Sequence, residues 1–242
     1  PQERGSLAHQ VAEAVARLII DQGLKPGDAL PAEGVLAERF GVSKPVVREG
    51  LSQLVGLGII ESRKGSVATV RRLSGKPLEA YFSVAVRQEP QGLRQAIELR
   101  RILEEHVVAV AADQITDEDV NSLRRCLGHL YVTKDLDEEW AVADAEFHRE
   151  ILRVADNATM GRILDALHGA LWETVSGVRR LHHPSDTLAS YKRHEAIFEA
   201  LARRDKEGAR AAMRAHFDAM SEAIDRLSDD LYVEAAAHEG VG

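Results

Sequence analysis

The chain has 242 residues, enough for two modest domains, and no apolar run approaches the ~20 residues that a membrane-spanning helix needs, so no membrane partner is expected. Its single cysteine, Cys126, excludes an internal disulfide framework and, with no hydrophobic signal segment at the N-terminus, indicates a cytoplasmic protein. The net charge of −8 argues against a nucleic-acid partner. The charge is unevenly distributed, however, because residues 1–75 hold 10 Lys or Arg against 8 Asp or Glu. A basic segment on an acidic remainder is typical of a chain that binds nucleic-acid phosphates at one end.

The first 70 residues predict a small helical module that ends in a hairpin. Apolar residues recur at helical spacing, and Gly and Pro mark the turns between the segments. The predicted elements are, in order, a helix from Leu7 closed by Gly23, a short helix ending at Phe40, a helix over 43–58 capped by Ser43, and strands at 59–62 and 67–70. This order is that of a winged helix-turn-helix.

Polar and basic side chains gather at the two places where such a module touches DNA. The exposed start of the third helix carries Ser43, Lys44 and Arg48, which we expect in the major groove. The hairpin tip carries Arg63 and Lys64, which we expect on the backbone or in the minor groove. A helical pair with a solvated charged face explains any one of these residues, but the whole pattern favours DNA binding.

The module contains the run LPAEGVLAERFGVSKPVVREGL at residues 30–51 and a Gly-containing wing after it. This pattern resembles the DNA-binding domain of the GntR family of bacterial transcription regulators, which implies that Gly65 of the wing also contacts DNA. Two residues depart from the family pattern. Gly34 stands where the family commonly has a DNA-contacting Arg, and Gly50 replaces a helical Ala at a cost of ~1 kcal/mol of helix propensity. Both departures predict weaker or altered operator recognition.

A polar, basic stretch broken by Gly and Pro at 71–77 predicts the domain boundary, and everything beyond it predicts helices. The expected helices span 77–88, 92–113, 116–132, 137–154, 157–181, 185–203 and 206–232. Their starts are marked by capping residues, namely Thr116 with Asp119, Asn157, Ser185 and Asp205. We therefore expect a mainly α chain with a winged helix-turn-helix at 1–72, a linker and extra helix at 73–92, a bundle of six to seven helices at 93–234 and a flexible tail at 235–242.

Four side chains of this bundle form a candidate metal site: Asp144, His148, His194 and His216. Asp144 and His148 are four residues apart, so both leave the same face of one helix. His194 and His216 lie on apolar faces of two later helices. One histidine on an apolar face is more often a satisfied core residue, but burying four polar groups without partners costs ~1–3 kcal/mol each. A divalent transition metal held by three imidazoles and a carboxylate satisfies all four.

The bundle also carries the motifs ELRRILE at 98–104, DAEFH at 144–148 and HEAI at 194–197. With Asn157, Asp205 and His216 they resemble the FCD effector-binding domain of FadR-type GntR regulators, over residues 93–220. The resemblance implies that a metal, most often zinc with nickel or manganese as alternatives, lies in the bundle cavity and helps to bind a small carboxylic acid. The resemblance also implies that Asn157 contacts the effector. Arg100 would either pair with the carboxylate of the acid or form a salt bridge with a residue of a neighbouring helix. The extra helix at 77–88 favours the seven-helix version of the domain.

The remaining histidines considered match no ligand motif and are interpreted as surface or packing residues: His106, His129, His168, His182 and His183. A DNA-reading module joined to a metal site predicts a metabolite-responsive transcription regulator, a repressor that binds a palindromic operator as a homodimer. One alternative is a metalloenzyme, although no spare Glu, Ser or Cys near the ligand motifs offers a general base or nucleophile. Another is a regulator whose metal is purely structural, for which a closed tetrahedral site is typical.

Overall fold

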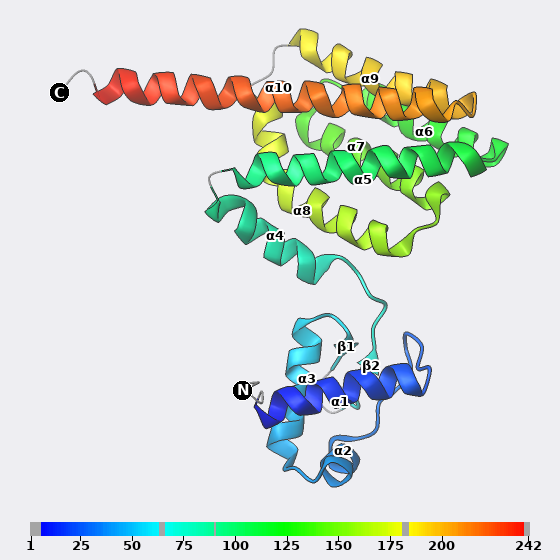
Figure 1. Cartoon of the computed structure of the whole chain (residues 1–242), viewed down its shortest axis with the longest axis vertical. Coiled ribbons are helices and arrows are strands. Elements are labelled where there is room, and N and C mark those ends of the chain that lie inside the picture. The colour runs from blue at the N-terminus through cyan, green and yellow to red at the C-terminus, as the bar shows by residue number, and fades with distance from the viewer. Residues whose placement is uncertain (1–5, 63–65, 90, 181–183, 240–242) are drawn as a thin grey trace. The chain divides into compact units, whose positions relative to one another are not determined.

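The computed structural model describes residues 6–62, 66–89, 91–180 and 184–239. The chain divides into two compact units, Pro1–Pro77 and Leu78–Gly242, each with its own apolar core. The fold class is the expected one, a winged helix-turn-helix followed by a helical domain (Figure 1). Within the described ranges, no helix is both long and apolar enough to cross a membrane.

The N-terminal unit contains three helices and a two-stranded wing. Its elements are α1 (Leu7–Asp21), α2 (Glu33–Phe40), α3 (Lys44–Gly56), β1 (Ile60–Glu61) and β2 (Thr69–Val70). The strands are antiparallel, with Ile60 opposite Val70, and Thr69 also bridges to Ala29. The expected DNA-contacting residues at the tip of the wing, Arg63, Lys64 and Gly65, lie outside the described residues.

Caps and one glycine fix where these helices begin and turn. Ser6 precedes α1, and its side-chain oxygen accepts a hydrogen bond of 3.2 Å from the N–H of His9. Gly41 ends α2 with φ of 65°, in the left-handed region that favours glycine, so the chain turns over residues 41–43 before α3 begins at Lys44. Ser43 holds the N-cap position of α3, as expected, but its side chain forms no capping hydrogen bond.

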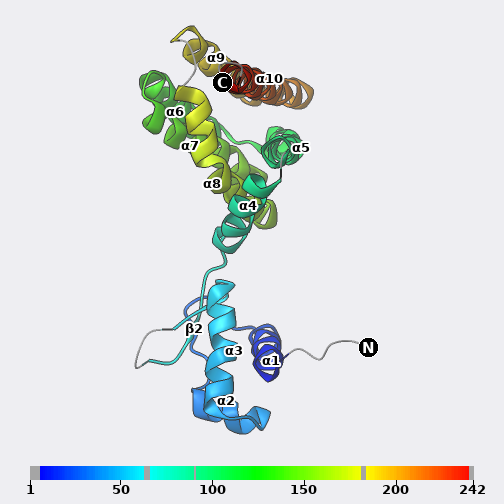
Figure 2. The same cartoon turned by 90° about the vertical axis from the view of Figure 1, so that its left-hand side faces the viewer.

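Gly50 has a packing role that its helix propensity does not reveal. Helix α1 crosses α3 in the view of Figure 1 and lies beside it in the view of Figure 2. Gly50 of α3 faces Ala8 and Val11 of α1 where the two helices meet. A Cβ added at Gly50 would lie 2.7 Å from the backbone oxygen of Ala8 and 2.9 Å from Cγ1 of Val11. Gly50 therefore permits close packing of two helices, and the loss of helix propensity is offset by that packing.

We expect Gly50→Ala to destabilise the protein by about 1–2 kcal/mol, because overpacking costs ~1–3 kcal/mol and the gain in helix propensity returns at most ~1 kcal/mol. Urea unfolding monitored by circular dichroism measures this difference. Gly56→Ala is the matched control, since a Cβ at Gly56 in the same helix meets nothing within 4 Å, and we expect it to be neutral or stabilising. A Gly50→Ala protein as stable as Gly56→Ala would contradict the packing role.

The second unit is built almost entirely from helices. They are α4 (Lys76–Gln88), α5 (Gly92–Gln114), α6 (Asp117–Thr133), α7 (Asp137–Ala155), α8 (Ala158–Arg180), α9 (Pro184–Ala202) and α10 (Lys206–Glu239). Helix α7 packs against α5, α6 and α8, and α10 packs against α5 and α9. This arrangement brings the inner faces of α5, α7, α9 and α10 together around a core that contains Phe147 and Phe217.

The helix boundaries agree with the expected caps at most positions. Thr116 and Asp119 form the complete capping box, and Asp205 accepts from the N–H of Gly208 at 2.9 Å. Helix α9 begins at Pro184, one residue before the expected cap Ser185. Helix α10 continues to Glu239 and so includes the first residues of the segment that was expected to be a flexible tail.

Candidate metal centre and DNA-reading surface

Three helices of the bundle bring four potential metal ligands together. They are Asp144 and His148 from α7, His194 from α9 and His216 from α10, hereafter the four-ligand cluster. One ligand atom from each residue lies within 4.8 Å of the other three. The three histidines are almost fully buried, whereas the side chain of Asp144 keeps 18% of its surface exposed. The candidate site predicted from spacing and apolar faces is thus gathered in one place.

The contact between His194 and Asp144 requires a cation. The backbone oxygen of Ser190 lies 2.9 Å from Nδ1 of His194, and because a carbonyl oxygen only accepts, Nδ1 carries a proton and donates it. In the neutral ring, Nε2 then presents a lone pair, and it lies 2.9 Å from Oδ1 of Asp144. Two acceptors at this distance repel each other unless a proton or a metal ion lies with them.

His216 supplies the clearest sign of a missing partner. Both of its ring nitrogens are buried, and neither has a hydrogen-bond partner among the described residues. Burial, together with the neighbouring His194 and His148, lowers the pKa of His216 well below its usual value, so the ring is neutral. A buried neutral imidazole without a partner is unfavourable, but it is the form that ligates a transition metal.

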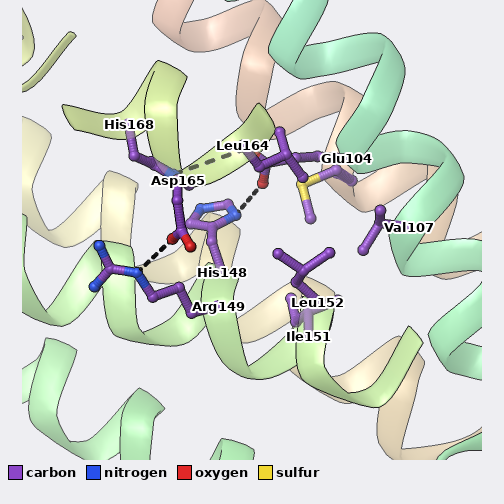
Figure 3. Close-up of a pocket in the computed structure, with 10 residues that line it drawn as sticks. Glu104, Val107, His148, Arg149, Ile151, Leu152, Leu164, Asp165 and His168 are labelled. Carbon is purple, nitrogen blue, oxygen red and sulfur yellow. Dashed lines mark hydrogen bonds and ion pairs between the residues drawn. The ribbon is translucent and has the colours of Figure 1, made fainter. Parts of the chain in front are cut away.

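His148 is oriented by a carboxylate on another helix. Its Nδ1 lies against Oε2 of Glu104 from α5 (Figure 3). Its Nε2 lies 3.9 Å from Oδ1 of Asp144. Burial lowers the pKa of His148, but the charge and hydrogen bond of Glu104 outweigh burial and raise it. Contact between one ring nitrogen and a carboxylate commonly fixes the other nitrogen as the metal ligand. The cluster therefore fits a divalent ion in donor type, burial and orientation.

The charge state of Asp144 agrees with this interpretation. Burial raises the pKa of Asp144, but the hydrogen bond with His194 and the charges of His148 and His194 hold it well below its usual value. Asp144 is therefore an ionised ligand. Once a bound ion displaces their ring protons, three imidazoles and one carboxylate would suit zinc, nickel or manganese better than magnesium or calcium, which prefer ligand sets made of oxygen atoms.

Arg100 lies beside the cluster in a buried ion pair. Its Nε and Nη2 donate to Oε1 of Glu104 at 3.0 and 2.9 Å, within the same helix, and its guanidinium stacks over the ring of Phe217. The salt bridge that was one of its two expected roles is therefore formed, but to a residue of α5 and not to a neighbouring helix. Its Nη2 also lies 2.6 Å from Nε2 of His168.

His168 of α8 completes this group, and its interpretation as a surface or packing residue leaves out the polar contacts that it forms there. Its Nε2 lies 2.6 Å from Nη2 of Arg100 and 3.9 Å from Oε1 of Glu104. Burial and the charge of Arg100 lower the pKa of His168 to about 3, so it is neutral and its Nε2 accepts from Arg100. His168 therefore takes part in a buried polar network with Arg100 and Glu104.

Asn157 has a structural role. It is exposed at the start of α8, where its side-chain oxygen accepts a hydrogen bond of 3.0 Å from the N–H of Met160. The expected N-cap at Asn157 is confirmed, and the effector contact expected there stays a prediction. Glu104 is a carboxylate that was not expected near the ligand motifs, and it lies against His148. The sequence does indicate that Glu104 pairs with Arg100, because the two residues are four apart on one helix face.

On the N-terminal unit, the side chains expected to contact DNA lie together at the start of α3. Ser43, Lys44 and Arg48 are all exposed. Arg48 forms a two-point ion pair with Glu33 of α2, through Nη2 at 2.8 Å and Nε at 3.3 Å. Glu33 is therefore a positioning residue that spacing along the sequence did not reveal.

The side chain of Lys44 lies next to Gly34. A Cβ built on Gly34 would lie 3.4 Å from Cε and 3.7 Å from Nζ of Lys44, so the lysine side chain extends over this glycine. A long side chain at position 34 would have to displace it. The exposed basic surface at the start of α3 therefore depends on Gly34 for the course of Lys44.

Comparison with known proteins gives matches over both units. Residues 7–70 match the model described as bacterial regulatory proteins, gntR family, and residues 95–219 match that of the FCD domain. The chain is 32% identical to the Glc operon transcriptional activator of Escherichia coli, over 88% of this chain and 87% of that protein. It is 28% identical to the HTH-type transcriptional repressor NanR of Escherichia coli, over 91% and 85%. A solved structure of Streptococcus agalactiae GntR has the same fold, with a TM-score of 0.63 and 23% identity over 89% of this chain and 99% of that one.

Proposed function

This chain belongs to the GntR family of bacterial regulatory proteins and carries an FCD domain, and from that premise we propose that it is a metal-dependent transcription regulator that responds to a small carboxylic acid. The coarser part, regulation of transcription, is given by both domains and by the relatives. The metal, the acid, the homodimer and the operator contacts belong to the proposal.

One observation carries the metal site: His216 is buried with two unpartnered ring nitrogens inside a group of described residues whose ligand atoms lie within 4.8 Å of one another. Asp144, His148, His194 and His216 would hold the ion, with zinc as the first candidate and nickel or manganese as alternatives. A divalent ion in this site supplies a coordination position for the carboxylate of an acid. Asp144, the most exposed member of the cluster, marks the side nearest solvent.

The DNA partner follows from the geometry of the N-terminal unit. Ser43, Lys44 and Arg48 at the start of α3 would read the major groove, with Arg63, Lys64 and Gly65 of the wing assisting. One such unit covers half a site, so a homodimer on a palindromic operator doubles the contact. Repression stays a prediction, since the relatives include both an activator and a repressor.

A metalloenzyme is the less favoured function for the same site. Glu104 is the carboxylate that could act as a general base beside the metal, but its Oε1 is bound to Arg100 and its Oε2 lies against His148. A purely structural metal fits the buried ligands as well, and the response of operator affinity to acids distinguishes it from the proposed function.

Two measurements test the proposed function. Metal analysis of protein purified without chelator should find about one divalent transition ion per chain, as a single ligand set implies. Operator affinity, measured by fluorescence anisotropy on DNA selected from random sequence, should change when a mixture of small carboxylic acids is added to the metal-loaded protein. Substoichiometric metal after zinc supplementation, or operator affinity that no acid changes, would contradict it.

A further inference from the structure

The charge on each ionisable group around the four-ligand cluster can be assigned, because nearly all of these groups are buried or paired. Helix α5 contributes Arg100 and Glu104, and α7 contributes Asp144. Arg149 of α7 and Asp165 of α8 line a pocket together with Glu104, His148 and His168 (Figure 3). They form an ion pair of 2.9 Å, so their charges cancel. The histidines that face the centre are His148, His168, His194 and His216.

The four histidines add no charge when a metal is bound. A ligating imidazole is neutral, which covers His148, His194 and His216. His168 accepts from the guanidinium of Arg100, which has only donors, so its Nε2 is unprotonated. The fixed charges are therefore one positive, Arg100, and two negative, Glu104 and Asp144.

Glu104 holds a special position in this set. Only 3% of its surface is exposed, and it touches both Arg100 through Oε1 and the ligand His148 through Oε2. Because the two-point contact with Arg100 pairs an anion with a group that cannot lose its proton, Glu104 is ionised. It cancels the positive charge of Arg100 where an incoming anion would otherwise encounter it.

We propose that Glu104 determines the charge of the effector: with a divalent ion bound, the centre carries a net charge of +1 and selects an acid with one carboxylate over an acid with two. The inference rests on the proposed function above and specifies the class of its ligand. Charges buried away from water are stable when they are matched, and a second carboxylate in this centre has no cation to pair with. Coordination alone predicts the opposite order, because two carboxylates chelate a metal better than one.

The experiment compares acids of equal chain length on zinc-loaded protein, using butanoate against succinate and propanoate against malonate, by isothermal titration calorimetry. We expect the monocarboxylate of each pair to bind roughly tenfold or more tightly, as expected for one unmatched buried charge. In the Glu104→Gln variant the centre carries +2, so the ratio should fall by about tenfold or reverse in favour of the dicarboxylates. Chelator-treated protein, with a net charge of −1, should bind none of the four acids.

Glu105→Gln is the matched control. Glu105 is the next residue of α5 and loses the same charge, but it pairs with Arg214 outside the centre, at 2.7 Å. Its acid preference should equal that of the wild type. The Arg100→Gln, Glu104→Gln double variant removes one charge of each sign, keeps the net charge at +1 and should recover the preference for monocarboxylates.

The outcomes separate this inference from the function on which it rests. Wild-type protein that binds succinate as tightly as butanoate overturns the role of Glu104, while the acid-responsive regulator stands. If Glu104→Gln loses its zinc, the comparison of acids on the wild type and on the Glu105→Gln control decides. If zinc-loaded wild type binds none of the four acids, the inference is overturned and so is acid binding at the metal. Operator binding that is retained in the same protein would then show that only the acid-binding part of the proposed function has failed.

Discussion

The His148→Ala, His194→Ala double variant should contain no bound divalent ion and should lose the thermal stability that the ion supplies. The two residues come from α7 and α9, so a bound ion ties separate helices together. A ligand that binds only the folded state stabilises it by about 4 kcal/mol when its free concentration is about 1,000 times its dissociation constant. Differential scanning fluorimetry with and without chelator, together with metal analysis, measures both effects.

The design separates loss of the metal from loss of packing. Both histidines are buried, so their truncation leaves cavities that lower stability by themselves. The informative quantity is therefore the shift in melting temperature caused by chelator, which should be large for the wild type and absent for the double variant. His106→Ala replaces an exposed histidine of α5 and should behave as the wild type does. A double variant that keeps one ion per chain would show that the cluster is an ordinary part of the core.

Much of the fold was predictable because local chemistry marks the ends of its helices. The Thr116–Asp119 capping box and the Gly41 turn fall where the sequence indicates them. The differences also have local causes. Proline is tolerated in the first turn of a helix, so α9 begins at Pro184 and not after Ser185. The segment beyond 235 begins with alanines, which have the highest helix propensity, and α10 continues through them.

The convergence of the four side chains of the cluster was predictable for a similar reason, because residues four apart share a helix face and apolar stripes mark the inward side of α9 and α10. Contacts between helices carry no such signal. Nothing along the sequence indicates that Glu104 meets His148 across two helices, that His168 meets Arg100, or that Glu33 holds Arg48. The role of Gly50 was hidden for the same reason, since a close approach depends on both helices at once.

Operator affinity should fall roughly a hundredfold or more in the Lys44→Ala, Arg48→Ala double variant, about tenfold or more for each side chain that is truncated. Both side chains are exposed at the start of α3, and no described group of opposite charge other than Glu33 pairs with Arg48. Removal of each interaction with a phosphate should also lower the slope of log affinity against log salt by about 1, because fewer counterions are released. Fluorescence anisotropy at several salt concentrations gives both numbers.

Arg17→Ala is the control, since it removes a positive charge from α1 of the same unit, where the side chain is 75% exposed and pairs only with Glu13 among described residues. Its affinity and salt slope should stay close to those of the wild type. Glu33→Ala tests how Arg48 is held: the net charge rises, so non-specific binding should strengthen, whereas discrimination between operator and random DNA should fall because Arg48 loses its fixed orientation. Retention of wild-type operator affinity by the Lys44→Ala, Arg48→Ala protein would place the DNA-binding surface elsewhere.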